Sequence, residues 1–385
     1  MTVPSHVLIV DDNADNRDLL ARILTKQGHT FSMATNGQEA LAMLAAAHFD
    51  LVLLDIMMPV LNGIETLRRI AKDGSIRHIP VIVVSAIDDV ENVVSCIELG
   101  AEDYLFKPVN KVILNARVSA CLEKKRLRDQ EQAYLTHVRQ ELELGRQIQS
   151  DFLPAILPAL VGWECAVSFL PAFEVAGDFY DLFMLQETKL CIVIADVCGK
   201  GVGAALFMAL VRSLMRAFAE QGHDGTGSIL HAAKLTNDYI TKHHRQKKSY
   251  MFATLFFGVL DTKTGEIDYI TAGHYPPLIL GNHATVRSLE LCGPALGITG
   301  SATFPIKKSV LEPGEIMFAY TDGVIEAKNE NEDLFTQERL LSILQDPVKN
   351  SHALLHAIEK SLKDHEGTAQ SSDDITMVAV KREIL

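Results

Sequence analysis

The sequence predicts an α/β protein with two domains, one doubly wound and one layered, joined by a long helix. The chain has 385 residues and is 48% apolar, enough for two or three domains with full hydrophobic cores. Between residues 6 and 110, short apolar runs alternate with amphipathic stretches, which indicates a parallel sheet covered by helices. From Trp163 onward, strand-like runs come in pairs interrupted by two long helical stretches, which favours layered packing over a repeated βαβ unit.

Five strands separated by helices are expected in the first domain. Two of the intervening stretches, Arg17–Lys26 and Glu65–Ala71, have the amphipathic pattern of surface helices. Ligands of such sheets bind at the carboxyl ends of the strands, so the residues that follow each strand are candidate site residues. The expected strands are His6–Val10, Thr30–Ala34, Leu51–Leu54, Val81–Val84 and Asp103–Phe106.

Polar residues follow four of these five strands. Asp11 and Asp12 follow the first, Asp55 the third, Ser85 the fourth and Lys107 the fifth. Taken singly, an Asp after a strand is usually a turn former or helix cap, but five such residues at one sheet edge would share a crevice. Three carboxylates there repel one another unless a hard cation such as Mg²⁺ lies among them. A carboxylate can also attack phosphorus to give an aspartyl phosphate, which the Lys107 ammonium and the Ser85 hydroxyl would bind.

A proline-free, highly charged stretch from about Val112 to Phe152 connects the two domains. Its apolar residues recur three or four positions apart, which predicts one face of a long helix. That face either pairs two copies of the chain as a dimeric coiled coil or packs on its own chain as a solvated linker. Pro154 and Pro158 are expected to end the helix. The apolar residues are Tyr134, Val138, Leu142, Gly145, Ile148 and Phe152.

The second domain is expected to contain six strands and two long helices. The helices are Ala204–Ala219 and Ser228–Lys242. The only tryptophan, Trp163, is most simply a core residue. The expected strands are Leu190–Ala195, Thr254–Leu260, Glu266–Thr271, Pro277–Leu280, Glu315–Tyr320 and Ile375–Val380.

Four acidic motifs in the second domain predict a two-metal hydrolytic site. Several abut expected strands although they lie far apart in the sequence, as a site with paired cations ~3.5–4 Å apart requires. The attacking group would be a metal-activated water, which agrees with the absence of a Cys-x5-Arg signature around any of the six cysteines. The motifs are AGDFYD with Asp178 and Asp181, IADVCGKG with Asp196, AYTDGVIEA with Asp322, and SSDDITMVAV with Asp373 and Asp374.

Two other features admit competing interpretations. Gly199 to Ala204 matches the G-x-G-x-x-A dinucleotide fingerprint between a strand and a helix. Asp196 just before it would repel a pyrophosphate, so these glycines more simply allow close backbone approach to metals and substrate. His274 in AGHYPP is either a general acid or, more commonly beside Gly and Pro, a turn-anchoring hydrogen-bonding residue.

The first domain resembles response-regulator receiver domains over roughly residues 5–122. The segments LIVDDN, LVLLDIMMPVLNG, VIVVSA and GAEDYLFKP carry the resemblance. It implies Asp55 as the phosphoacceptor, with Asp11, Asp12, Asp55 and the backbone carbonyl of Met57 as Mg²⁺ ligands. It also implies that Ser85 and Lys107 bind the phosphoryl group and that Tyr104 is the switch aromatic.

The second half resembles the SpoIIE/RsbU-type branch of the PPM metal-dependent phosphatases over roughly residues 140–383. The acidic motifs, the entry ELELGRQIQSDFLP, YITAGHYPPLIL and CGPALGI carry this resemblance. It implies an α-β-β-α sandwich and two Mn²⁺ or Mg²⁺ ions. Asp181 and Asp374 are acidic neighbours in these motifs, and we expect them to have structural roles or to lie outside the metal ligands. One departure is Ala176, where the family usually has Gly. The implied metal ligands are the side chains of Asp178, Asp196, Asp322 and Asp373 and the backbone carbonyl of Val197.

The composition of the chain indicates which partners and which cellular compartment to expect. A net charge of −13 makes nucleic acid and anionic membrane unfavourable partners. The scattered cysteines are most simply reduced thiols, and neither a signal peptide nor an apolar run of about 20 residues is evident. A cytoplasmic protein is therefore expected. The expected parts are a receiver at 1–122, a helical linker at 123–153 and a phosphatase at 154–385.

Together these features predict a phosphorylation-regulated serine/threonine phosphatase of a bacterial two-component, partner-switching pathway. The resemblance implies a phosphorylated STAS-type anti-sigma-factor antagonist as substrate, a histidine kinase as phosphodonor and a separate serine kinase that opposes the phosphatase. A homodimer is expected through the linker. The alternative is a non-catalytic response-regulator adaptor that binds a sigma factor or another regulatory protein, against which the four intact carboxylates argue.

Overall fold

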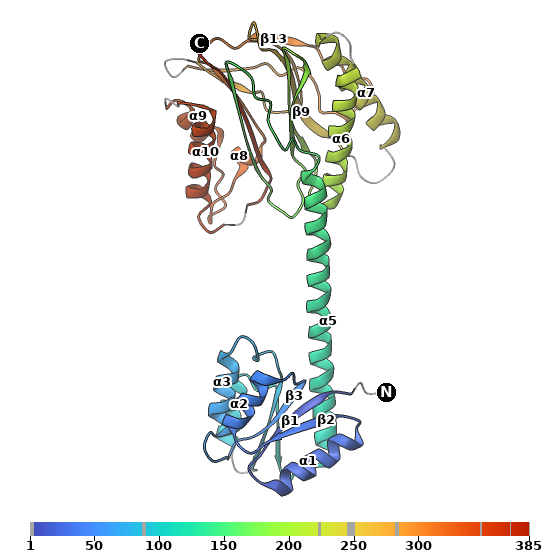
Figure 1. Ribbon diagram of the computed structural model, residues 1–385, viewed down its shortest axis with the longest axis vertical. Helices are drawn as coiled ribbons and strands as arrows, with labels where there is room; N and C mark the ends of the chain where they lie inside the picture. Colours follow the sequence, from blue (N-terminus) through green and yellow to red (C-terminus); the bar gives the residue numbers. More distant parts are fainter. Residues whose placement is uncertain are drawn as a thin grey trace. The chain divides into compact units, whose positions relative to one another are not determined.

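The computed structural model describes residues 4–86, 90–221, 225–244, 251–281, 285–346, 349–369 and 371–384. The chain divides into two compact units, Met1–Val138 and Arg139–Leu385. One helix, α5, begins in the first unit and ends in the second (Figure 1). The domain boundaries expected from the sequence, after residues 122 and 153, stay predictions.

The first unit is a five-stranded parallel sheet with helices on both faces. The strand order is β2-β1-β3-β4-β5, so the predicted doubly wound fold is confirmed. The sequence placed all five strands, and the structure extends the last three by one or two residues. The strands are β1 (His6–Val10), β2 (Thr30–Ala34), β3 (Leu51–Asp55), β4 (Val81–Ala86) and β5 (Asp103–Lys107).

Two hydrophobic cores flank this sheet because its central strands are buried on both faces. Helices α1 (Ala14–Lys26) and α5 (Lys111–Ser150) cover one face, and α2, α3 and α4 cover the other. Asn13 caps the first helix by accepting hydrogen bonds from two backbone N–H groups. The second set of helices is α2 (Gly37–Ala46), α3 (Gly63–Lys72) and α4 (Val90–Glu98).

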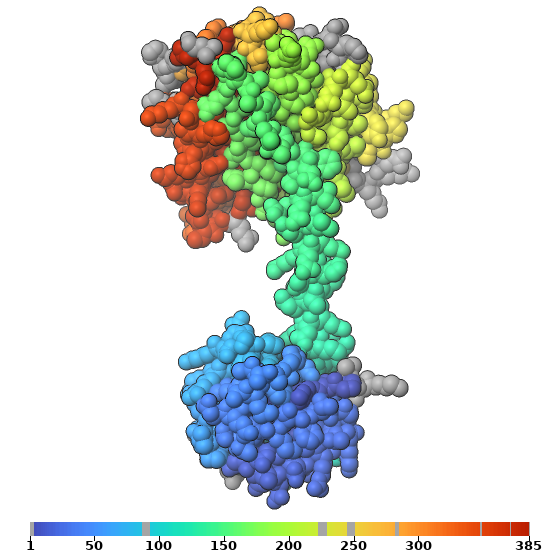
Figure 2. Space-filling model, in the orientation of Figure 1, coloured from blue at the N-terminus to red at the C-terminus, as the bar shows by residue number. Residues whose placement is uncertain are grey.

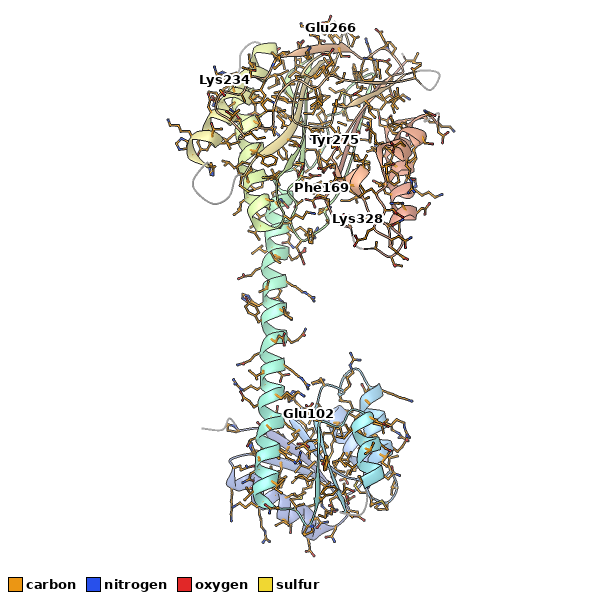
Figure 3. The ribbon with its side chains drawn as sticks, turned by 180° about the vertical axis from the view of Figure 1, so that it is seen from behind. Glu102, Phe169, Lys234, Glu266, Tyr275 and Lys328 are labelled. Carbon is orange, nitrogen blue, oxygen red and sulfur yellow. The ribbon has the colours of Figure 1, made fainter. Side chains whose placement is uncertain are left out.

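Helix α5 is a single 40-residue helix. Its first turns belong to the receiver-like core through Leu114, Val118 and Cys121. Glu102, labelled beside α5 in Figure 3, accepts hydrogen bonds from Lys124 and Arg128 of this helix. From this anchor onward, α5 is drawn in green in Figure 2, and several of its apolar residues are exposed. The helix ends at Ser150, before the predicted Phe152. The exposed apolar residues include Leu127 (54%), Tyr134 (69%), Leu144 (57%) and Ile148 (54%).

The second unit is built on two antiparallel five-stranded sheets. Their strand orders are β13-β10-β9-β8-β7 and β12-β11-β14-β15-β6. The first sheet contains β7 (Phe179–Gln186), β8 (Lys189–Val197), β9 (Ala253–Asp261), β10 (Glu266–Ala272) and β13 (Lys307–Val310). The second contains β6 (Trp163–Leu170), β11 (Leu278–Leu280), β12 (Val286–Ser288), β14 (Ile316–Tyr320) and β15 (Ile375–Arg382).

These sheets form the middle layers of an α-β-β-α sandwich, as predicted. Side chains from both sheets, such as Ile194 and Met317, make the core between them. Helices α6 (Val202–Gln221) and α7 (Gly225–His243) pack on the first sheet, and the remaining helices pack on the second (Figure 1). The latter are α8 (Gly323–Glu326), α9 (Gln337–Leu344) and α10 (Ser351–Glu366).

Helix α6 passes a length-and-composition test for a membrane span, which the sequence analysis did not anticipate. Its Phe207, Met208 and Val211 are buried in the core that α6 shares with α7 and the first sheet. It is therefore a core helix of the sandwich.

Candidate functional site

The first unit brings its predicted polar residues together at the carboxyl ends of its strands. Asp11 and Asp55 are buried, Asp12 is exposed, and an oxygen from each carboxylate lies within 4.8 Å of the others. Lys107 Nζ lies 2.9 Å from Asp11 Oδ2 and 2.9 Å from Asp55 Oδ2. One ammonium thus faces three carboxylates, a donor set that leaves excess negative charge for a hard cation such as Mg²⁺.

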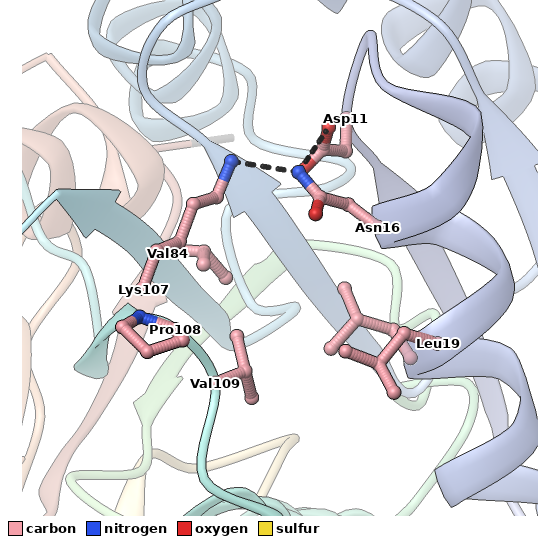
Figure 4. Close-up of a pocket in the computed structure, with 8 residues that line it drawn as sticks. Asp11, Asn16, Leu19, Val84, Lys107, Pro108 and Val109 are labelled. Atoms are coloured by element: carbon pink, nitrogen blue, oxygen red, sulfur yellow. Dashed lines mark hydrogen bonds and ion pairs between the residues drawn. The ribbon is translucent and has the colours of Figure 1, made fainter.

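Asp11 is held in place by residues that follow β1. The backbone N–H of Asn13 donates to its Oδ1 at 2.8 Å, and Asn16 Nδ2 lies 3.2 Å and 3.1 Å from its two oxygens. Figure 4 shows Asn16 and Lys107 beside this carboxylate, at a pocket that Pro108 and Val109 also line. Sequence reasoning missed Asn16, which lies one helical turn into α1, away from the strand ends that it searched.

The electrostatics of this crevice favour bound cations. Burial and the neighbouring Asp11 carboxylate raise the pKa of Asp55, although the Lys107 ammonium and the Met57 backbone N–H oppose the shift. Burial lowers the pKa of Lys107, but its contacts with Asp55 and Asp11 outweigh that effect and raise it.

The remaining predicted receiver residues surround this centre. Ser85 is buried at the end of β4, in register with Phe106 of β5. Tyr104 is half-buried, packs edge-on against Phe106 at 5.2 Å and lies 5.0 Å from the Arg117 guanidinium. Met57 follows β3 and is 69% exposed, and its backbone N–H donates a hydrogen bond to the Asp55 carboxylate.

The second unit places its predicted carboxylates at one end of the sandwich, two on each sheet. Asp178 directly precedes β7, and Asp196 is the second-to-last residue of β8. These two strands are neighbours in the sheet, and Phe179 pairs with Ala195. Asp322 follows β14 and Asp373 precedes β15, where Tyr320 pairs with Met377. Strand ends of both sheets therefore supply the four side chains that the sequence analysis selected.

Among the four carboxylates, Asp178 is held by side-chain hydrogen bonds from the other sheet. Its Oδ2 accepts hydrogen bonds from the hydroxyls of Thr321 and Thr376, both at 2.7 Å. Thr376 N–H in turn donates to Thr321 Oγ1 at 3.0 Å. The second sheet thus orients a carboxylate of the first. Sequence reasoning missed both threonines, although each lies within three residues of a predicted aspartate in the TDG and DDIT motifs.

The side chains of Asp374 and Asp181 contact groups other than the four carboxylates, and the roles expected for these two residues stay predictions. Asp374 accepts hydrogen bonds from the backbone N–H groups of Ala172 and Gly177 at 2.8 Å and 2.7 Å, which fixes the loop before Asp178. Asp181 is buried and paired with Arg212 at 2.8 Å and Arg216 at 3.3 Å.

Close backbone packing defines the rest of this edge. A Cβ on Gly177 would lie 3.0 Å from the carbonyl oxygen of Val197, the predicted backbone ligand. A Cβ on Gly323 would lie 2.0 Å from the Asp374 carbonyl oxygen, so only glycine fits beside Asp322. Glycine at these two positions lets the four acidic motifs approach one another.

The four carboxylates give this site an excess of negative charge, which bound metal ions would neutralise. Burial, with repulsion from Asp196, raises the pKa of Asp178, and burial, with repulsion from Asp322 and Asp373, raises the pKa of Asp196. Burial, Glu326 and Asp373 raise the pKa of Asp322 to about 6. These carboxylates fit divalent cations because bound cations would remove the repulsion.

The four carboxylates are more spread out than those of the first unit. Among described residues, the set of three whose oxygens all lie within 4.8 Å is Asp11, Asp12 and Asp55. Asp373 is 37% exposed and its Oδ2 lies 3.0 Å from Lys200 Nζ. A spread donor set agrees with two cations better than with one.

His274 is unsuited to the role of general acid. It is 2% exposed, and its Nδ1 lies 2.9 Å from Thr254 Oγ1 on β9. Burial lowers the pKa of His274 to about 4, so the ring is neutral near pH 7. The hydrogen-bonding role is therefore the better interpretation. Trp163 is buried as predicted, and its Nε1 donates to the Thr262 carbonyl at 2.9 Å.

The end of α5 contacts the loop that precedes Asp178. The buried Gln149 donates through Nε2 to the Ala176 carbonyl at 2.7 Å and accepts from the Ala176 N–H at 2.9 Å. Ala176 is the position that departs from the family pattern, and it is buried without exposed side-chain atoms. The sequence analysis included this glutamine in its entry motif but assigned it no role.

Two family models match this chain, one in each unit. The model for stage II sporulation protein E (SpoIIE) matches residues 186–383, and the response regulator receiver domain model matches residues 7–119. The first range includes Asp196, Asp322 and Asp373 and begins after Asp178.

Two relatives and one solved structure are each similar to this chain over 63–65% of its length. Protein IcfG of Synechocystis sp. is 42% identical over 266 residues, covering 63% of this chain and 42% of IcfG. Phosphoserine phosphatase RsbU of Bacillus subtilis is 26% identical, covering 64% of this chain and 71% of RsbU. The SiaA-PP2C domain of Pseudomonas aeruginosa shares the fold, with a TM-score of 0.54 at 22% identity, over 65% of this chain and 98% of that one.

The SpoIIE match covers half of the chain, and the receiver match covers the separate unit that holds Asp11, Asp55 and Lys107. The chain therefore belongs to the stage II sporulation protein E (SpoIIE) family and carries a response regulator receiver domain ahead of its SpoIIE domain.

Proposed function

We propose that this chain is a metal-dependent protein phosphatase that hydrolyses phosphoserine or phosphothreonine and is regulated by phosphorylation of its receiver domain. One observation supports the catalytic half above all. Four carboxylates from two sheets, Asp178, Asp196, Asp322 and Asp373, meet at one edge, and for three of them mutual repulsion contributes to a raised pKa. Such an arrangement is unfavourable in a structural core and useful for binding cations.

In this proposal, Asp178, Asp196, Asp322, Asp373 and the Val197 carbonyl hold two Mn²⁺ or Mg²⁺ ions. Bound there, the ions would supply a water of lowered pKa and neutralise phosphate charge. Thr321 and Thr376 keep the Asp178 carboxylate oriented, since both donate to the same oxygen. Asp374 keeps the loop of Gly177 in place. The chain provides no serine or cysteine nucleophile in this scheme.

The receiver half would control the catalytic half. Asp55 would accept a phosphoryl group from a histidine kinase, with Mg²⁺ bound by Asp11, Asp12, Asp55 and the Met57 carbonyl. Lys107 and Ser85 would bind the phosphoryl oxygens, and Tyr104 would respond to the new position of Ser85. The contact of Lys107 with both Asp11 and Asp55 supports this assignment.

The substrate and partners are those of a partner-switching pathway. The relative RsbU is a phosphoserine phosphatase, which supports a phosphorylated STAS-type anti-sigma-factor antagonist as the substrate and a separate serine kinase as the opposing enzyme. The exposed apolar side chains of α5, including Tyr134 and Ile148, support a cytoplasmic homodimer that pairs through this helix.

The catalytic proposal is tested by replacing Asp322 with Asn. Turnover of p-nitrophenyl phosphate with Mn²⁺ should fall by at least about a hundredfold, because the carboxylate's charge is lost from the cation site. Asp268→Asn is the matched control, since Asp268 on β10 pairs with Lys308 away from this edge. Activity of Asp322→Asn at the level of the control would contradict the metal site. Inactivity of the wild-type chain itself would favour the non-catalytic adaptor.

A further inference from the structure

A lysine stands at the edge of the phosphatase site on a loop shaped to present it. Lys200 lies between β8, which carries Asp196, and α6. Its neighbours Gly199 and Gly201 have φ angles of +94° and +75°, in the left-handed region that glycine adopts without strain. The two glycines let the chain turn sharply on either side of the Lys200 side chain.

The Lys200 ammonium contacts the acidic cluster directly. Nζ lies 3.0 Å from Asp373 Oδ2 and donates to the Ser372 carbonyl. The side chain is still 48% exposed and its Nζ lies 5.9 Å from the ring centroid of Phe173, which is itself 48% exposed. The Lys200 side chain therefore lies beside a proposed metal ligand and is also partly exposed to solvent.

The backbone around Lys200 also favours an anion. Helix α6 begins two residues later and is 20 residues long, and its N–H groups at this end carry partial positive charge. Ala205 N–H donates to the Gly201 carbonyl, so the helix starts directly from the loop. A lysine and a helix N-terminus thus lie on one loop beside four carboxylates.

The contact with Asp373 is one that bound cations would weaken. Cations shared by Asp373 reduce the negative charge that holds the ammonium there. Lysine has a flexible four-carbon side chain and binds phosphate as a point charge, so a small rotation can move Nζ from the carboxylate to an incoming anion. The Lys200 side chain is 48% exposed, which leaves room for this change of partner.

We propose that Lys200 is a phosphate-binding residue, which leaves Asp373 and contacts a phosphoryl oxygen of the substrate when the metals are bound. The inference rests on the proposed phosphatase function and adds to it a cationic group for the substrate, separate from the metal ligands. Phe173 forms the adjoining wall and keeps the ammonium near the site through its ring face.

The test compares Lys200→Met, Lys200→Arg and a matched control. The control is Lys189→Met, because Lys189 is at the opposite end of β8 and pairs with Asp261 at 2.8 Å. The probe is inorganic phosphate, whose dissociation constant is measured by calorimetric titration of the full chain in Mg²⁺. Mn²⁺ affinity is measured separately by electron paramagnetic resonance of the free ion.

Lys200→Met should weaken phosphate binding about tenfold, as expected for loss of one hydrogen bond to a charged group. Lys200→Arg should retain most of the affinity, and Lys189→Met should match wild type. Mn²⁺ binding by Lys200→Met should be as tight as in wild type or tighter, because no ammonium competes for Asp373.

Two results would overturn the inference while the phosphatase function stands. One is wild-type phosphate affinity in Lys200→Met. The other is weaker Mn²⁺ binding in that variant, which would make Lys200 a positioning residue for Asp373. If the wild-type chain neither binds phosphate nor hydrolyses p-nitrophenyl phosphate, the proposed function and this inference both fail.

Discussion

Asp55 is the proposed phosphoacceptor of the receiver domain and lies beside both a lysine and the proposed cation site. Its Oδ2 lies 2.9 Å from Lys107 Nζ, and oxygens of Asp11 and Asp12 are close by. Asp55→Ala should abolish labelling of the chain by acetyl phosphate, because the change removes the carboxylate that is proposed to form the aspartyl phosphate. Phosphate-affinity electrophoresis measures the label. Asp73→Ala, at an exposed carboxylate after α3, is the control, and labelling of Asp55→Ala at the control level would disprove the receiver assignment.

His274 gives the phosphatase domain a specific dependence on pH. Its folded-state pKa of about 4 lies below the ordinary value of 6.5, so between these values the unfolded chain binds a proton that the folded chain does not. Stability from this group is therefore present above pH 6.5 and lost as pH falls toward 4, by up to about 3 kcal/mol.

The variant His274→Asn should remove this part of the pH dependence. Thermal unfolding of the full chain, followed from pH 7 to pH 4.5, should show a smaller fall in Tm for the variant than for wild type. The exposed His356 on α10 provides the control variant His356→Asn, which should behave as wild type. Parallel Tm curves for wild type and His274→Asn would contradict the assignment of a neutral, buried imidazole.

At the scale of elements, sequence pattern was most informative where strands and functional residues coincide. All five receiver strands were predicted, and the central ones were the clearest because a strand buried on both faces is a continuous apolar run, as in Leu51–Leu54. Strands β6 and β7 were missed, although β7 directly follows Asp178, since they mix exposed and buried positions irregularly. The short edge strands β12 and β13 have few buried residues and gave no pattern to detect.

The aspartates of both candidate sites could also be predicted from the sequence. Aspartates at strand ends are recognisable in sequence because their chemistry is distinctive, and the structure brings the predicted ones to two sheet edges. Thr321, Thr376 and Asn16 were missed because their importance depends on which side chain they reach, 143 and 198 positions away for the two threonines. Only tertiary structure contains that information.

At the scale of elements, a contact made by the last turn of α5 can be tested directly. Gln149 makes two hydrogen bonds to Ala176, two residues before Asp178, and both groups of Ala176 would be left unpaired and buried without it. Gln149→Leu should raise the Mn²⁺ concentration for half-maximal activity about tenfold, since an unsatisfied buried group costs about 1–3 kcal/mol. The exposed Gln147 gives the control, Gln147→Leu. Equal Mn²⁺ requirements in the two variants would show that the loop is fixed without Gln149.

At the scale of the whole molecule, α5 is the continuous element shared by the two units. We expect the double change Val138→Glu with Leu142→Glu to leave metal-dependent hydrolysis measurable but insensitive to acetyl phosphate, because it places charge on the apolar face of the helix. Wild-type activity is expected to rise on phosphorylation. Hydrolysis rates with and without acetyl phosphate measure the response.

A matched pair of charges distinguishes the apolar face from added charge alone. Gln132→Glu with Thr136→Glu has the same spacing on exposed polar positions of α5 and should keep the response. If the Val138 and Leu142 variant responds as this control does, the signal passes by direct contact between domains and the helix is a tether.

The division of the four carboxylates proposed to bind metal between two sheets has a consequence for mutations far from them. Asp178 and Asp196 lie at strand ends of one sheet, whereas Asp322 and Asp373 lie at strand ends of the other, and buried side chains such as Ile194 and Met317 lie between the sheets. We therefore expect the thickness of that hydrophobic layer to set the width of the proposed metal site. Close-packed interiors transmit a change of even one methylene, so residues of the layer act as spacers for chemistry that they never touch.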